Sequence, residues 1–119
     1  MKRGEVWSVA GGPGFGGKQR PAVIIQDDAF PMTASVTVCG FTSTLVDAPL
    51  LRLRFPAGGS TGLREDSDLM IDKPFTLRRD QLGQRIGTLS VPDLVRLNRA
   101  LLVFLGLATP VRPRVTADI

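Results

Sequence analysis

The sequence predicts a mainly β fold, a small and strongly bent β-barrel, followed by one C-terminal helix. Thirteen glycines and nine prolines among 119 residues divide the chain into short segments, which favours turns and short strands over a helical bundle. Several of these segments alternate apolar and polar residues with a period of two, as half-buried strands do. Apolar residues recur at helical spacing only near the C-terminus. We expect one domain over residues 1–108, with 109–119 as a flexible or partner-ordered tail.

Seven short segments have the composition of strands. Residues 35–42 are rich in β-branched side chains, and residues 51–55 alternate most clearly between apolar and charged residues. Residues 22–25 are continuously apolar, which predicts a strand buried on both faces. The remaining predicted strands are 4–9, 68–71, 75–78 and 85–89, where 68–71 and 75–78 are either two short strands or one strand interrupted by Lys73-Pro74.

The predicted helix begins after Ser90, which has Asp93 three residues further on, as in a capping box. Gly106 and Pro110 end it, giving about 15 residues. Its apolar side chains recur at three- and four-residue steps: Leu94, Leu97, Leu101 and Leu105. Val95, Leu102 and Val103 widen this apolar face, so we expect the helix to pack on the sheet or at a dimer contact.

The stretch around Arg20 is the first candidate for a binding site. A glycine-rich loop containing Phe15 and Lys18 leads to Arg20, which precedes Pro21. A residue before proline favours extended backbone, so Arg20 is expected at the start of a strand. A fixed guanidinium beside a glycine loop suits an anionic ligand such as phosphate, although a solvated charge at a strand end is the alternative. Phe15 either clamps a nucleobase or pins the loop to the barrel.

Other polar segments are further candidates, each with a structural alternative. Thr42 and Ser43 close a predicted strand, where hydroxyls either cap a turn or donate hydrogen bonds to phosphate. Arg52 and Arg54 share one strand face, which is either a ligand surface or an edge protected by charge. The acidic cluster at residues 65–68 is dense enough to suggest a metal, but without histidine we interpret it as a solvated turn and predict no metal site.

Composition limits the possible chemistry. The net charge of +4 makes a polyanionic partner plausible. The absence of histidine excludes imidazole acid–base pairs and Ser-His-Asp or Cys-His arrangements. The single cysteine, Cys39, lies in an apolar strand pattern and is expected to be buried and inert. No apolar run is long enough to span a bilayer, so we expect a cytoplasmic protein.

Arginine, lysine and hydroxyl side chains beside a glycine loop can bind phosphate and stabilise charge that develops on it. RNA carries its own nucleophile, the 2′-hydroxyl. A metal-free RNA cleavage that leaves a 2′,3′-cyclic phosphate and a 5′-hydroxyl is therefore chemically open to such a site. The same route is closed for DNA, which lacks that hydroxyl.

Several motifs resemble the MazF/PemK toxin family, in order along residues 2–107. They are Lys2-Arg3-Gly4-Glu5-Val6-Trp7, the glycine loop, Arg20-Pro21-Ala22-Val23-Ile24-Ile25-Gln26-Asp27-Asp28, Phe41-Thr42-Ser43, Gly62-Leu63-Arg64-Glu65-Asp66-Ser67 and Leu77-Arg78-Arg79-Asp80-Gln81-Leu82, followed by the helix. The resemblance implies an SH3-like (CcdB/PemK-type) barrel homodimer. It also implies a toxin–antitoxin system in which the toxin is a sequence-specific, metal-independent endoribonuclease that cleaves single-stranded RNA without a cofactor.

By the same resemblance, Arg20 and Thr42 are the catalytic pair: Arg20 would contact the scissile phosphate and serve in proton transfer, and Thr42 would hydrogen-bond the same phosphate. The predicted substrate-binding residues are Phe15, Lys18, Ser43, Arg52, Arg54 and Arg78. We expect an acidic, partly disordered segment of a cognate antitoxin to lie across a groove lined by Arg20, Arg52 and Arg54. Because arginine is a poor general base, the proton acceptor stays open; Asp27, Asp28 and Lys18 are the nearby candidates.

Two other functions fit the same fold. The first is a non-enzymatic toxin that poisons a protein such as DNA gyrase through its C-terminal helix. The second is a plain RNA-binding barrel. Neither would need Arg20 or Thr42 for catalysis.

Overall fold

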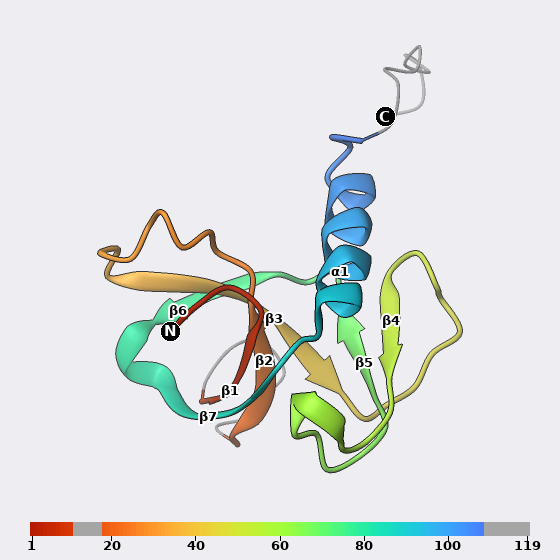
Figure 1. Ribbon diagram of the computed structural model, residues 1–119, viewed down its shortest axis with the longest axis horizontal. Coiled ribbons are helices and arrows are strands. Elements are labelled where there is room, and N and C mark those ends of the chain that lie inside the picture. The colour runs from red at the N-terminus through yellow and green to blue at the C-terminus, as the bar shows by residue number, and fades with distance from the viewer. Residues whose placement is uncertain (11–17, 109–119) are drawn as a thin grey trace.

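The computed structural model describes residues 1–10 and 18–108 (Figure 1). Phe15 and the predicted tail 109–119 lie outside this part of the chain. The described strands are β1 Glu5–Val9, β2 Arg20–Ile24, β3 Ser35–Thr42, β4 Arg52–Phe55, β5 Ser67–Met70, β6 Phe75–Arg78 and β7 Leu82–Thr88. Two single-turn 3₁₀ helices, η1 Gly59–Thr61 and η2 Arg79–Gln81, precede β5 and β7, and the helix α1 spans Val91–Phe104. Every predicted strand is present, within a few residues of its expected bounds.

The strands form one antiparallel sheet in the order β4-β5-β3-β2-β1-β7. The long strand β3 is its centre: β2 pairs with it along one edge, while β6 and β5 pair with its first and last residues along the other. The prediction of a mainly β fold with one C-terminal helix is confirmed.

The predicted β-barrel is not closed, because no strand ladder among the described residues joins β4 to β7. The gap between these edges is bridged by the η1 segment, which packs directly on the backbone of β7. A Cβ atom at Gly87 would overlap the backbone of Ser60 and Thr61, and one at Gly62 (φ +70°) would overlap the carbonyl of Ile86. Glycine at both positions allows the two backbones to approach, so the sheet is bent and covered at this point without ladder closure.

Two groups of buried apolar side chains hold the sheet. One lies between the sheet and α1 and includes Val23, Phe41 and Leu97. The other includes Ala22, Ile24 and Val36 on the opposite face of β2. The prediction that residues 22–25 are buried on both faces is confirmed for Ala22, Val23 and Ile24, with Ile25 partly buried.

The helix begins as predicted and buries only part of its expected face. The Ser90 hydroxyl accepts a hydrogen bond from the Asp93 amide at 3.2 Å, which confirms the N-cap. Leu97 and Leu101 are buried, but Leu105 is 57% exposed. Figure 1 shows the last turns of α1 extending past the sheet, and the apolar side chains there, Leu102, Val103, Phe104 and Leu105, are 41–57% exposed.

Cys39 is fully buried in β3, and burial raises the pKa of its thiol to about 12. The prediction of a buried, inert thiol is confirmed. None of the helices in the described ranges is both long and apolar enough to cross a membrane.

Candidate active site

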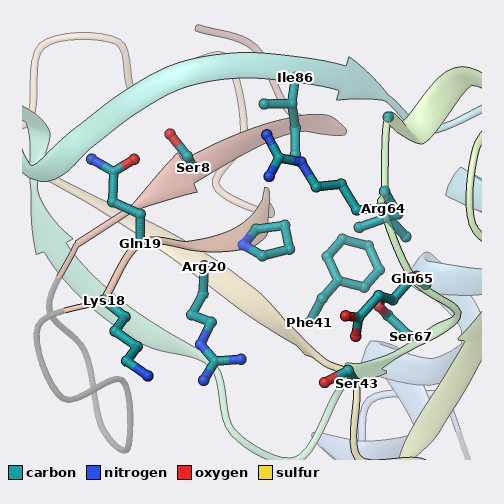
Figure 2. Close-up of a pocket in the computed structure, with 13 residues that line it drawn as sticks. Ser8, Lys18, Gln19, Arg20, Phe41, Ser43, Arg64, Glu65, Ser67 and Ile86 are labelled. Carbon is teal, nitrogen blue, oxygen red and sulfur yellow. Dashed lines mark hydrogen bonds between the residues drawn. The ribbon is translucent and has the colours of Figure 1, made fainter.

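A cavity of 570 Å³ opens where β2 begins and β3 ends (Figure 2). Its apolar wall consists of Pro21, Phe41, Leu63 and Ile86. Its charged side chains are Lys18, Arg20, Arg64 and Glu65, and its other polar side chains are Ser8, Gln19, Ser43 and Ser67. Three cations and one carboxylate therefore share a single concave site, which suits a ligand with a negatively charged backbone.

The pairing of β2 with β3 explains why Arg20 reaches this cavity. Ala22 pairs with Gly40 and Val23 with Cys39, so two further residues of the same register place Arg20 opposite Thr42. Arg20 is the first residue of β2, as expected for a residue before proline. The central ladder of the sheet thus fixes the backbone of Arg20 next to the end of β3.

Of the two hydroxyl residues that end β3, Ser43 lines the cavity and Thr42 does not. The Thr42 hydroxyl instead accepts a hydrogen bond from the Thr44 amide at 3.2 Å, which caps the turn. Side chains of successive residues point to opposite faces of a strand, so only one of the two is expected in the cavity. The catalytic role of Thr42 stays a prediction, and of these two residues it is Ser43 whose hydroxyl lines the cavity.

Arg64 and Glu65 are the cavity residues that sequence reasoning missed as site residues. Both belong to the turn before β5, and the pairing of Thr42 with Asp68 brings this turn to the end of β3. Figure 2 shows the Glu65 carboxylate close to Ser43 on the opposite side of the cavity from Lys18. Both residues belong to the family motif Gly62–Ser67, but only the pairing of β3 with β5 shows that this motif lies beside the cavity.

The other predicted substrate-binding arginines lie outside the cavity, and each pairs with an aspartate. Arg52 Nε lies 3.2 Å from Asp72, and Arg78 Nε lies 3.0 Å from Asp80. Arg54 Nε lies 2.6 Å from Asp68. The expected groove lined jointly by Arg20, Arg52 and Arg54 is therefore not formed, because β4 and β2 are separated by β5 and β3 and the β4 arginines are held by neighbouring carboxylates.

The prediction of a solvated acidic turn is wrong for Asp68. Its side chain is 1% exposed and accepts hydrogen bonds from Arg54 and, at 2.9 Å, from the Val46 amide. The Arg54 hydrogen bond and the Val46 amide hold the pKa of Asp68 below its usual value despite its burial. Asp68 thus ties the loop that follows Ser43 to β4 and β5. Within residues 1–10 and 18–108, no three acidic or thiol side chains gather closely enough to hold a metal.

Replacing Asp68 with asparagine should lower stability at pH 7 by about 1–2 kcal/mol, because the buried acceptor of Arg54 and Val46 loses its charge. A carboxyl with a depressed folded pKa contributes stability above its unfolded pKa, near 3.9, and loses it as pH falls through the folded value. Thermal unfolding should therefore show a Tm lowered by about 5 °C at pH 7 and a difference that shrinks below about pH 4.

Asp80→Asn is the matched control, because both partners of the Arg78–Asp80 pair are 73% exposed. Exposed pairs contribute little, so its Tm should follow the unsubstituted protein at every pH. An Asp68→Asn protein with an unchanged Tm at pH 7 would contradict the assignment.

The aspartates considered as proton acceptors lie at the far end of β2 from Arg20. Asp27 and Asp28 follow the end of β2 at Ile24 and border a second cavity of 240 Å³, whereas Arg20 begins β2 and lines the first cavity. The Asp27 carboxylate accepts from the Ala29 amide at 3.0 Å, and the Asp28 carboxylate accepts from the Arg3 amide at 2.7 Å. Both are therefore wrong as candidate bases for a reaction at Arg20.

Comparison with known proteins identifies the family of this chain. Residues 2–105 match the family described as "PemK-like, MazF-like toxin of type II toxin-antitoxin system". The chain belongs to this family. The resemblance read from the sequence motifs is thereby confirmed.

Relatives in this toxin family match over nearly their whole length. The chain is 52% identical over 108 residues to the "Probable endoribonuclease MazF" of Mycolicibacterium smegmatis, covering 91% of this chain and 99% of the relative. It is 30% identical over 116 residues to "Endoribonuclease MazF9" of Mycobacterium tuberculosis, covering 90% and 98%. A solved structure, "Endoribonuclease in complex with its cognate antitoxin from Mycobacterial species", superposes with a TM-score of 0.74 at 28% identity, covering 92% of this chain and 99% of that one.

Proposed function

We propose that this toxin is an endoribonuclease that cleaves single-stranded RNA at particular sequences, without a metal, by attack of the substrate's own 2′-hydroxyl. The observation that carries the proposal is the cavity in which Arg20, Lys18 and Ser43 converge. Cations and hydroxyls of this kind bind a phosphodiester and stabilise the charge of its transition state. The names of the mycobacterial relatives support the reaction class.

Each cavity residue has a role in this proposal. Arg20, fixed at the start of β2, contacts the scissile phosphate through its planar guanidinium, which can donate two parallel hydrogen bonds. Ser43 donates a hydrogen bond from its hydroxyl to the same phosphate. Thr42, the preceding residue, stays a predicted second donor to that phosphate. Lys18 and Arg64 add positive charge to the cavity, which favours the phosphate backbone of RNA. Arg52, Arg54 and Arg78 stay predicted contacts to RNA beyond the cavity, and Phe15, which is outside the described residues, stays a predicted contact to RNA.

We propose two protein partners. One is a cognate antitoxin with an acidic segment, which the antitoxin complex of the solved relative supports. The other is a second copy of the chain, which would cover the apolar end of α1, where Val103, Phe104 and Leu105 are 42–57% exposed. Exposed apolar clusters of this kind are typical of interfaces.

Incubating the purified toxin with a pool of single-stranded RNA oligonucleotides in EDTA tests the proposal. We expect cleavage within one short sequence context. A DNA gyrase supercoiling assay with the same preparation tests the alternative function. Uncut RNA across the pool together with inhibited supercoiling would favour the gyrase poison.

A further inference from the structure

We propose that Glu65 is the general base of the reaction, accepting the proton of the attacking 2′-hydroxyl. This inference rests on the proposed ribonuclease function. It adds a residue that neither the sequence motifs nor the comparisons assign.

The chemistry of the cavity calls for a carboxylate. A group that takes a proton near neutral pH needs a free lone pair, which arginine and lysine do not offer when protonated and which serine offers only weakly. Histidine, the commonest base, is absent from the chain. Glu65 is the one carboxylate among the described residues that line the cavity. The adjoining segment 11–17 contains only glycine, proline and phenylalanine, so it brings no ionisable side chain.

The neighbouring carboxylates are already engaged. Asp66 accepts a hydrogen bond from the Ala57 amide at 2.8 Å, and Asp68 is buried against Arg54. Within the described part of the chain, the Glu65 side chain forms neither an ion pair nor a hydrogen bond. Its backbone carbonyl accepts from the Ser67 hydroxyl at 2.9 Å, which fixes the turn while leaving the carboxylate free.

The arrangement of charges suits an in-line displacement. Figure 2 shows the Arg20 guanidinium between the Lys18 ammonium and the Glu65 carboxylate. A phosphate held by Arg20 would therefore have a proton acceptor on one side and a proton donor on the other. Attack and departure in such a reaction occur on opposite sides of the phosphorus, and we assign one proton transfer to each of these two groups.

The 2′-oxygen gives its proton to a Glu65 carboxylate oxygen and forms a bond to phosphorus, while the bond from phosphorus to the 5′-oxygen breaks. The departing 5′-oxygen takes a proton from the Lys18 ammonium. The proton on Glu65 then returns to Lys18 through solvent, which restores both groups and leaves a 2′,3′-cyclic phosphate and a 5′-hydroxyl.

Glu65→Gln tests the assignment, because the amide keeps the size of the side chain and loses its basicity. With an RNA oligonucleotide that the unsubstituted toxin cleaves, kcat should fall by about 10²–10³-fold while KM changes little. The fall in rate on the acidic side of the pH profile should disappear. Glu65→Asp should recover part of the rate, and added formate should partly rescue Glu65→Ala. Asp27→Asn, which removes a carboxylate at the far end of β2 and keeps its hydrogen-bond acceptor, should cleave at the unsubstituted rate.

The possible results distinguish a failure of the Glu65 assignment from a failure of the ribonuclease proposal. No cleavage by the unsubstituted toxin would overturn the ribonuclease proposal itself. Cleavage by the unsubstituted toxin with an unchanged Glu65→Gln rate would overturn only the role of Glu65. A slower Glu65→Gln protein that keeps the acidic limb of the profile, or a Glu65→Ala protein that formate does not rescue, would also overturn it, because the loss would then reflect binding or folding.

Discussion

Arg20→Ala is expected to lower kcat for RNA cleavage by about 10³-fold, because in the proposed mechanism the Arg20 guanidinium, which lines the cavity, stabilises the charge on the scissile phosphate. Arg20→Lys should retain a small part of the activity, since lysine keeps the charge but cannot make two parallel hydrogen bonds. Single-turnover cleavage of one defined oligonucleotide measures both variants.

Arg85→Ala is the control for Arg20→Ala. Arg85 lies on β7, pairs with Glu5 at 3.4 Å and is 53% exposed, and it does not line the cavity. Both variants should unfold within about 0.5 kcal/mol of the parent protein, because neither side chain is buried in the core. Normal cleavage by a folded Arg20→Ala protein would remove Arg20 from the reaction.

A single 2′-deoxyribose on the 5′ side of the scissile phosphate should abolish cleavage at that position, since the substrate then lacks the nucleophile. Binding should change little, because the phosphates that contact the cations are intact. Gel analysis of chimeric oligonucleotides compares this substrate with one that carries the deoxyribose one nucleotide away, which should be cut normally. Continued cleavage of the first chimera would show that water attacks the phosphorus instead.

The parts of the fold that the sequence predicted well depend on local rules. The Arg20–Pro21 pair and the apolar residues after it place a buried strand, and Ser90 with Asp93 places the start of α1. The open sheet depends on a long-range contact instead. Nothing local in Gly62 or Gly87 indicates that η1 and β7 would pack backbone to backbone.

The candidate site also combines features set by local sequence with features set by long-range contacts. Arg20, Lys18 and Ser43 were predicted from their own segments, and the structure brings them into one cavity. Arg52 and Arg54 share a strand face, as the alternation of the sequence indicates. Their partners are Asp68, which lies in β5, and Asp72, which follows β5. These ion pairs form because β4 pairs with β5, a long-range contact that the sequence does not show. Glu65 was assigned to a solvated turn because the β3–β5 ladder that carries it to Ser43 is not visible in the sequence.

The measurement that tests the central proposal most directly is the chemical identity of the two new RNA ends formed in EDTA. Mass spectrometry of the fragments from a defined oligonucleotide should find a 2′,3′-cyclic phosphate on one fragment and a 5′-hydroxyl on the other. A 3′-hydroxyl with a 5′-phosphate, or cleavage that stops when EDTA is added, would contradict a metal-free attack by the 2′-hydroxyl.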